Sequence, residues 1–599
     1  MTRLQILSIV VLLVLAMVLL TGFDHERPFW PQWGRNPQHT GMVDVSAQPL
    51  NEKLADIVYD PFVKQEVAES FAGSLAVHYQ STLIDGDSFY MLGKSGKYPS
   101  CHPVGNWQNG AHCGPNAWNE VQWNVVRYDW KHDRAVSTWT FATDWKPEPN
   151  ASNFAMGFLG LAGEEPVFHP ALAHGHLYVP GAGGTLWKVD RHSGKAESHI
   201  NPFAGKRIHP AATFTAGPLS ADEDGDIYYN VIELNTKGNP WNQNDVENAW
   251  LVKVAPDDTS VTVSFATLVP NAPPGNSTNC PGTFNNLNDN GASLPWPPTP
   301  TSVPPTEPCG SQRPGLNVAP AIARDGTVYT VSVAHFDGMV SYLLAVNPDL
   351  TPKWAKSLQN LLSDGCGVLM PIAAQGVTDE PNSCRYGTTV GVDPTTNAAG
   401  SGVVSDQGTA SPTVLPDDSI LFGVVDNYNY GRGHLLHFDP AGNFLNQYTF
   451  GWDYTPGVYT HDHTYSMVVK DNSYGLPAYC FFNNPVCGFL PPGPFLVTQL
   501  DAGMNVEWSF QNTTFDKDNP NGYEWCVNAP VIDREGLVYA LSEDGHLYSI
   551  PQGHKGVFKK PHQKILLKEE LPAAYTPLSI GEDGKVYSQN AGHLLVVGR

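Results

Sequence analysis

One short unit of apolar and polar positions recurs along the chain. Each clear copy has a small residue and Pro, a short apolar run, an acidic residue with Gly, and then alternating Val-x-Tyr or Leu-Tyr. Asp-Gly suits a two-residue hairpin turn with positive φ, and the alternation that follows is typical of a strand with one buried face. The unit therefore predicts a β-hairpin. The eight corners are Asp85-Gly86, His174-Gly175, Asp224-Gly225, Asp325-Gly326, Asp417-Asp418, Asp471-Asn472, Glu535-Gly536 and Asp583-Gly584.

Further strands follow most of these hairpins. A third apolar run ends in a turn former, as at Leu186–Asp190, and the fourth strand often carries Trp. A Trp at this place, as at Trp139, Trp354 and Trp508, suits the packing of one sheet on the next. Four-stranded sheets repeated around an axis define a β-propeller.

The last copy, from Tyr575, leaves room for only three strands before the chain stops. The strand-like segment Leu54–Tyr59 has no other partner and would complete that sheet, which removes exposed edges. We expect an all-β, eight-bladed β-propeller with its eighth blade shared between the chain ends. Seven blades would result if the copy near Asp471 is not a blade.

The composition supports this fold class. With 56 Gly, 51 Pro and 15% charged residues among 599, the chain indicates many short strands joined by turns. The expected organisation is an export segment at 1–23, a lead-in at 24–53 and one propeller at 54–599. Long, Gly- and Pro-rich insertions are expected near 94–119 and 270–314.

The amino terminus is basic and then apolar from Leu4 to Phe23, the pattern of an export signal. Its length is close to the roughly 20 residues that span a bilayer, so a cleaved signal peptide and a retained transmembrane anchor are both open. The expected location is the periplasm or the extracellular space, with membrane contact through this segment only.

Nine cysteines agree with an oxidising compartment. If consecutive cysteines pair, four disulfides would cross-link four irregular insertions and Cys526 would stay unpaired. Spacing alone does not decide the connectivity. The candidate disulfide residues are Cys101 and Cys113, Cys280 and Cys309, Cys366 and Cys384, and Cys480 and Cys487.

Charge limits the class of partner. The chain has 34 basic and 58 acidic residues, a formal net charge of -24. Phosphate binding needs a concentrated basic face, so nucleic acid is excluded as a partner. The expected partner is a protein or an extracellular ligand at a propeller face.

The segment Trp30–Gly41 and the repeated Asp-Gly-x-Val-Tyr pattern resemble those of the pyrroloquinoline-quinone (PQQ) propellers. That superfamily includes quinoprotein alcohol dehydrogenases and the lipoprotein of the outer-membrane β-barrel assembly machine. The resemblance implies the fold and allows PQQ and calcium as cofactors. The enzyme pattern is not matched: the sequence has no Cys-Cys pair and no convincing tryptophan-docking repeats. No calcium-binding set or catalytic Asp can be assigned.

Few residues qualify as ligand-binding candidates. His461 and His463 would lie on the same side of a strand, where they could bind a ligand or simply hydrogen-bond to loops. Two His without a third ligand do not make a metal site, so no metal is assigned. Glu524 and Asn528 flank Cys526 and would face the central channel, and Arg432 could contact an anion.

The sequence therefore predicts an exported PQQ-like propeller that acts as a binding or scaffolding module in the cell envelope. The alternative is a PQQ- and calcium-dependent dehydrogenase, and the residues alone do not decide whether the protein is an enzyme.

Overall fold

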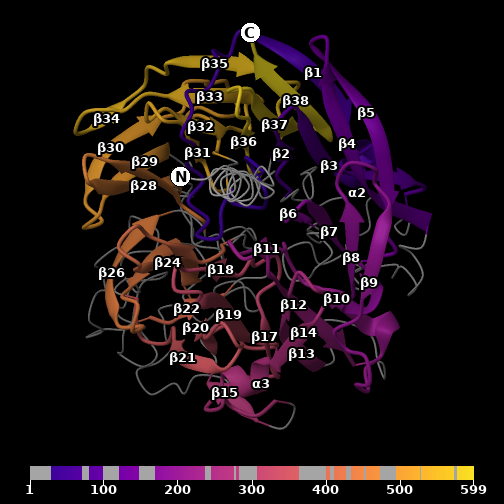
Figure 1. Ribbon diagram of the computed structural model, residues 1–599. Helices are drawn as coiled ribbons and strands as arrows, with labels where there is room; N and C mark the ends of the chain where they lie inside the picture. Colours follow the sequence, from indigo (N-terminus) through magenta and orange to yellow (C-terminus); the bar gives the residue numbers. More distant parts are fainter. Residues whose placement is uncertain are drawn as a thin grey trace, which may run out of the picture.

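The computed structural model shows a ring of radially arranged β-sheets (Figure 1). Eight sheets of four or five strands and one two-stranded sheet make up the described chain. The prediction of an eight-bladed, all-β propeller is confirmed, and the seven-bladed alternative is wrong. The residues that the structure describes are 28–69, 80–98, 120–146, 169–235, 245–275, 278–281, 306–362, 400–404, 410–426, 433–450, 454–472, 494–525, 528–571 and 576–599.

Strands follow one another outwards within each blade. Blade 1 consists of β2 (Leu83–Asp85), β3 (Ser88–Gly96), β4 (Val121–Lys131) and β5 (Arg134–Ala142). Blade 2 consists of β6 (Ala171–Ala173), β7 (His176–Pro180), β8 (Leu186–Asp190) and β9 (Ala196–Ile200). Blade 3 consists of β10 (Thr213–Thr215), β11 (Ser220–Ala221), β12 (Ile227–Leu234), β13 (Val246–Val254) and β14 (Ser260–Ser264). Blade 4 consists of β17 (Gln312–Pro314), β18 (Ala321–Ile322), β19 (Val328–Ala334), β20 (Ser341–Val346) and β21 (Pro352–Ser357).

The second half of the ring repeats this order. Blade 5 consists of β22 (Gly402–Val403), β23 (Thr413–Val414), β24 (Ile420–Asp426), β25 (Gly433–Phe438) and β26 (Phe444–Phe450). Blade 6 consists of β27 (Gly457–His461), β28 (Thr464–Asn472), β29 (Phe495–Asp501), β30 (Val506–Gln511) and β34 (Val557–Phe558). Blade 7 consists of β31 (Val531–Ile532), β32 (Val538–Leu541), β33 (His546–Ile550) and β35 (Gln563–Leu566). Blade 8 consists of β36 (Ser579–Ile580), β37 (Val586–Asn590), β38 (His593–Gly598) and β1 (Glu52–Val58).

The acidic-glycine corners join the first and second strands. In blades 1 and 2 they are two-residue turns, as predicted, because Asp85 pairs with Ser88 and Ala173 pairs with His176. The corner of blade 4 is a longer turn. In blade 4, Gly326 N–H donates to Ala323 O (2.9 Å) and Ala323 N–H donates to Thr327 O (2.8 Å). Of the corner pair, only Gly326 has a positive φ, 80°. This is the three-residue loop that ends in a left-handed residue, which makes Gly the favoured residue there. We call the end of the ring that carries these turns the corner end, and the opposite end the far end.

The corner of blade 6 was misplaced. Asp471 and Asn472 end β28, so the prediction of a hairpin corner there is wrong. The turn is formed by Asp462 and His463, with φ of 45° and 64°, between His461 and Thr464. Two consecutive positive φ values fit the two-residue primed turn. This corner lacks Gly, which is why the pattern did not reveal it.

Tryptophans of the fourth strands dock on the neighbouring blade, as predicted for Trp139 and Trp354. A Cβ on Gly194 would lie 2.5 Å from Trp139 Cδ2, and one on Gly442 would lie 2.9 Å from Trp354 Cδ2. Trp354 Nε1 also donates to Pro440 O (3.1 Å) in the next blade. These contacts confirm the prediction that the fourth-strand tryptophans pack one blade on the next.

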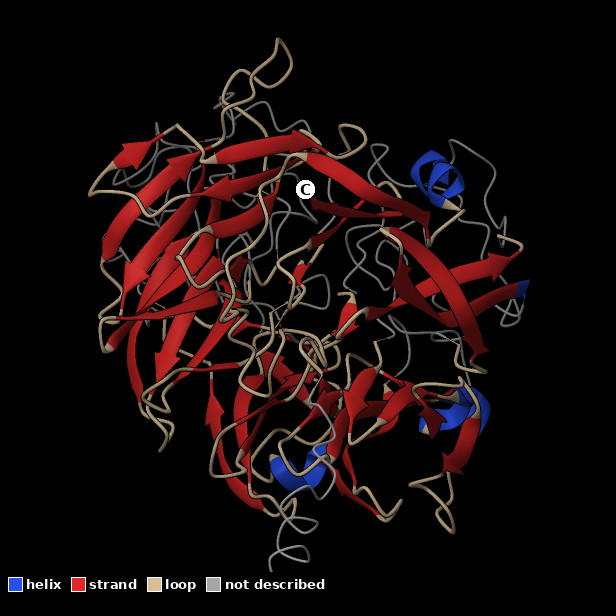
Figure 2. Ribbon diagram, turned by 45° about the horizontal axis from the view of Figure 1, so that its top comes forward, coloured by secondary structure: helices blue, strands red, loops and turns tan. Residues whose placement is uncertain are grey.

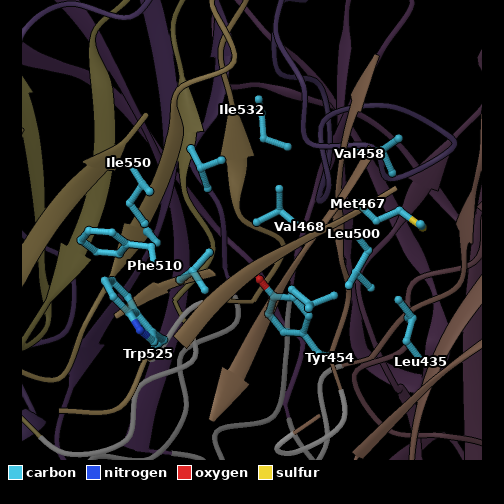
Figure 3. Packing of buried hydrophobic residues seen from close by; sticks show 14 of the residues in the cluster. Leu435, Tyr454, Val458, Met467, Val468, Leu500, Phe510, Trp525, Ile532 and Ile550 are labelled. Atoms are coloured by element: carbon cyan, nitrogen blue, oxygen red, sulfur yellow. The ribbon is translucent and has the colours of Figure 1, made fainter. Parts of the chain in front are cut away.

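Apolar side chains fill the spaces between blades. Leu435 of blade 5, Met467 and Phe510 of blade 6, and Ile532 and Ile550 of blade 7 belong to one buried cluster (Figure 3). Because each sheet is covered on both faces, second and third strands such as β12 and β20 are buried almost throughout, unlike an outermost strand such as β14.

Helices are minor in the described chain, as Figure 2 shows. None of them is long and apolar enough to cross a membrane, and the predicted export segment lies outside the described residues. The helical elements are α2 (Val63–Glu69), α3 (Phe265–Leu268), η6 (Ala182–Gly184) and η7 (Pro210–Ala212).

A small hairpin carries the one disulfide seen among the described residues. The strands β15 (Asn279–Pro281) and β16 (Thr306–Pro308) pair beside the Cys280–Cys309 bond, which confirms that predicted pair. The cysteines of the other three predicted pairs lie outside the described residues. Strand β3 continues to Gly96 and β17 begins at Gln312, and most of each predicted insertion, at 94–119 and 270–314, lies outside the described residues.

The chain ends close the ring in blade 8, as predicted. Strand β1 pairs with β38 from Glu52 opposite Gly598 to Val58 opposite His593 (Figure 1). Just beyond β1, Asp60 Oδ2 lies 2.6 Å from Lys94 Nζ of blade 1, and both side chains are buried. This ion pair ties the closing strand to the blade that follows it.

We predict that Asp60→Asn lowers the free energy of unfolding by about 3 kcal/mol, because it removes a buried carboxylate that lies 2.6 Å from the buried Lys94 ammonium. Asp56→Asn is the matched control, since Asp56 lies on β1 four residues before Asp60, is half exposed and pairs with His593 at the surface. It is expected to cost less than about 1 kcal/mol. Denaturant titration measures both, and equal losses would contradict the role given to Asp60.

Candidate functional site

The lead-in, residues 28–50, runs along the innermost strands of the ring at the corner end. At equivalent positions of seven blades, the N–H of an inner-strand residue donates to a lead-in oxygen. Six acceptors are main-chain carbonyls, and the seventh is Gln32 Oε1, which accepts from Ala221 N–H. The main-chain pairs are Ile84 N to Trp30 O (2.9 Å), Leu172 N to Pro31 O (2.7 Å), Ile322 N to Pro37 O (2.7 Å), Val414 N to Gln38 O (3.0 Å), Val458 N to Thr40 O (2.8 Å) and Ile532 N to Gly41 O (3.2 Å).

The eighth blade is reached last, where Gln48 N–H donates to Gly584 O (2.7 Å). The lead-in therefore forms a hydrogen bond with every blade, in the order in which the blades follow one another along the chain. The inner edge of each sheet would otherwise present unpaired amides to the channel, and buried amides need partners. One short segment supplies these partners to the whole ring.

The middle of the lead-in forms a buried plug, made by Trp33 and His39. Both side chains are almost completely buried, and their rings meet edge to face with centroids 5.1 Å apart. Trp33 packs against Ala319 and Ala529, which precede the inner strands of blades 4 and 7. His39 Nδ1 lies 2.8 Å from Pro412 O, so this nitrogen carries the proton and donates.

Close contact with the blades restricts the lead-in sequence. Gly41 has a φ of 68°, and a Cβ there would lie 2.8 Å from Pro530 O. No side chain fits at this position. The glycine thus allows the lead-in to turn from blade 6 into blade 7.

A second set of hydrogen bonds links the residues that precede the inner strands. His169 Nε2 accepts from Ser81 N–H (3.0 Å), which joins blade 2 to blade 1. Farther along the ring the pairs are Ala319 N to Ser411 Oγ (2.9 Å), Ser411 N to Thr455 Oγ1 (2.9 Å) and Thr455 N to Asn528 Oδ1 (3.1 Å). These groups lie at the channel but are engaged with one another. We call them the channel belt.

The ligand-binding candidates from the sequence do not form one site. Asn528 belongs to the channel belt and is fully buried. Glu524 is half-buried, and its carbonyl accepts from Glu543 N–H (3.0 Å) and Ser542 Oγ (2.9 Å). Arg432 and Cys526 lie outside the described residues.

The prediction that His461 and His463 share one side of a strand is wrong. His461 ends β27, where its ring stacks on Tyr459 and its Nε2 lies 2.8 Å from Ser466 Oγ. His463 is an exposed residue of the turn, with a positive φ. His461 thus ends the strand and His463 is the second residue of the primed turn that follows it, so they do not share one side of a strand.

The described residues do not fit a calcium site of the enzyme type. Within those ranges, no three His, Cys, Asp or Glu side chains lie close enough together to hold a metal ion. Calcium takes six to eight oxygen ligands, commonly including carboxylates. The polar side chains around the inner strands include the Ser, Thr, Asn and His groups of the channel belt and the buried Gln312 and Arg313 of β17. The described ones do not form the carboxylate-containing set that calcium takes.

Comparison with known proteins agrees with the fold. No family model and no curated protein matches the sequence. A europium-containing methanol dehydrogenase shares 11% identity at a TM-score of 0.46, covering 93% of this chain and 89% of that one. The quinohemoprotein alcohol dehydrogenase from Comamonas testosteroni shares 12% at 0.47, covering 96% and 81%. BamB from Moraxella catarrhalis shares 13% at 0.37, covering 80% and 91%.

The eight-bladed fold rests on this chain's own strand pairing, and the resemblance to PQQ propellers stays a prediction beside these structural neighbours. At such identities and TM-scores, they decide neither activity nor partner. They include both dehydrogenases and BamB, so the role of this chain has to be argued from its own residues.

The buried plug and the channel belt each contain a histidine whose pKa is lowered by burial. Burial lowers the pKa of His39 and of His169 to about 4, whereas a free His titrates near 6.5. Between these values, only the unfolded chain binds the proton. Each His therefore contributes stability that is complete above about pH 6.5 and is lost as the pH falls towards 4, by about 1.4 kcal/mol per pH unit.

We predict that His39→Asn makes the loss of stability between pH 6.5 and 4.5 shallower by about 1.4 kcal/mol per pH unit. The Asn amide keeps a donor for Pro412 O, so folding is retained. Denaturant titration at stepped pH measures the slope. His463→Asn is the control, because this exposed turn position tolerates Asn. Equal slopes for the parent and His39→Asn would contradict the buried neutral His39.

Proposed function

We propose that this protein is an exported propeller that acts as a binding or scaffolding module in the cell envelope. The observation that supports this most is the lead-in, because the chain's own Trp33 and His39 are buried among the residues that precede the inner strands, where a small ligand could otherwise bind. The channel belt beneath it is hydrogen-bonded to itself. This end of the ring is thus arranged for stability.

The far end is the proposed binding face. In an antiparallel meander, connections from the second to the third strand and from one blade to the next lie at the end opposite the hairpin corners. The longest connections of this chain are of those two kinds or, for Pro281 to Thr306, part of the blade 3 to blade 4 connection within the β15–β16 hairpin. They join Tyr98 to Glu120, Lys146 to His169, Pro281 to Thr306, Leu362 to Gly400 and Asn472 to Pro494. Long connections on a rigid scaffold are where binding residues concentrate.

Photo-cross-linking in intact cells tests this face. A photoreactive residue at Lys97, which is 77% exposed beside the far end of β3, is expected to give a discrete adduct of higher mass. The same residue at Asp325, 65% exposed at the corner end, is the control and should give none. Adducts at Asp325 alone, or none at either place, would contradict the proposal.

The runner-up, a PQQ- and calcium-dependent dehydrogenase, predicts a different result. We expect that purified protein mixed with PQQ and calcium retains no quinone absorbance after gel filtration. We also expect no oxidation of alcohols or sugars with an artificial electron acceptor. Stoichiometric quinone that stays with the protein, together with turnover, would favour the enzyme and overturn the scaffolding proposal.

A further inference from the structure

The lead-in enters the ring at a defined point. Trp30 forms two main-chain hydrogen bonds with Ile84, N to O at 3.0 Å and O to N at 2.9 Å. Ile84 is followed by Asp85 and the corner turn of blade 1, so the chain enters at the corner end. Phe29, the preceding residue, packs against the cluster shared by blades 7, 8 and 1.

The apolar segment Leu4–Phe23 is close to this entry point. Only six residues, 24–29, separate Phe23 from Trp30. A fully extended chain advances at most about 3.6 Å per residue, so this tether spans roughly 25 Å at most. The ring cannot move farther than that from wherever the segment is held.

We propose that the propeller is held with its corner end towards the membrane and its far end away from it, an orientation that rests on the proposed envelope location and on retention of Leu4–Phe23 as an anchor. Entry at the corner end and the short tether together carry this inference. The bilayer is the one surface to which an apolar segment of about 20 residues is suited.

The reverse orientation needs more chain than is present. From the inner strand, the tether would cross three further strands at about 4.8 Å each, roughly 14 Å. It would then have to follow the length of a blade. Strand β3 has nine residues, which at about 3.3 Å each adds roughly 30 Å. The tether covers little more than half of this path.

A shorter path through the channel is blocked. Trp33 and His39 are buried at the corner-end mouth, where the lead-in bonds to the inner strands on every side. The anchor therefore cannot leave through the ring. The corner end remains the only end of the ring within reach of a bilayer-inserted segment.

Charge on the corner end affects how closely it can approach lipid. Exposed carboxylates lie at this end, among them Asp87, Asp325, Asp418 and Asp462. Anionic headgroups would repel them, although salt screens charges beyond about 8 Å. The tether, and not charge attraction, then keeps this end near the bilayer.

Blade 1 offers a matched pair of probe positions. Asp87 immediately precedes β3 and Lys97 immediately follows it, and both are exposed. The nine residues of β3 lie between them and separate them by roughly 33 Å along the blade. A genetically encoded azide at either position can carry the same fluorophore without involving the native cysteines.

The experiment uses the full chain in phosphatidylcholine vesicles that contain a lipid with a nitroxide on its headgroup. We expect the protein to float with the vesicles and the fluorophore at position 87 to be quenched several-fold more strongly than that at position 97. Failure to float would overturn the anchor and the orientation with it. Flotation with equal quenching, or with stronger quenching at 97, would overturn the orientation alone.

Discussion

The innermost strands of an eight-bladed ring have main-chain amides without partners within the sheets, and the lead-in pairs with them. Each blade places the edge of its innermost strand at the channel, so eight rows of amides would lack partners in a partly buried space. The lead-in accepts hydrogen bonds from seven of these edges and donates one to the eighth blade. An unpaired buried amide costs about 1–3 kcal/mol, so each of these hydrogen bonds stabilises an inner strand. Because one segment makes all of them, the inner strands of the eight blades are stabilised together.

The same pairing decides which end of the molecule is available for function. The plug of Trp33 and His39 closes the corner end, and the channel belt uses the polar side chains below it. The long connections attach at the other end. Strand β1 closes the ring by pairing with β38, and the Asp60–Lys94 ion pair joins this closing segment to blade 1. The amino-terminal region thus stabilises the ring from both the inside and the outside.

Local patterns were sufficient to predict the blades. Asp325-Gly326 marks a turn because only a residue that tolerates positive φ suits its last position, and Trp354 marks an interface because an indole needs a flat, small partner such as Gly442. The turn Asp462-His463 escaped because Asp and His can adopt the left-handed region without a glycine. Its misassignment also led to the wrong pairing of His461 with His463.

Long-range contacts were beyond the sequence pattern. The lead-in was noticed as a motif, but its hydrogen bonds join residues such as Gln38 and Val414 that are hundreds of positions apart. Nothing in the spacing of Asn528 indicates that its amide caps Thr455 of the preceding blade. Such residues look like ligand-binding candidates because buried polar groups serve structure and function alike.

Backbone hydrogen exchange of the intact protein tests the central claim most directly. If the lead-in pairs with the inner strands, the amides of Ile322, Val414, Val458 and Ile532 should exchange as slowly as those of the second strands beside them. Exchange of these four amides within seconds, while the second strands stay protected, would show that the inner edges are unpaired and would contradict the account.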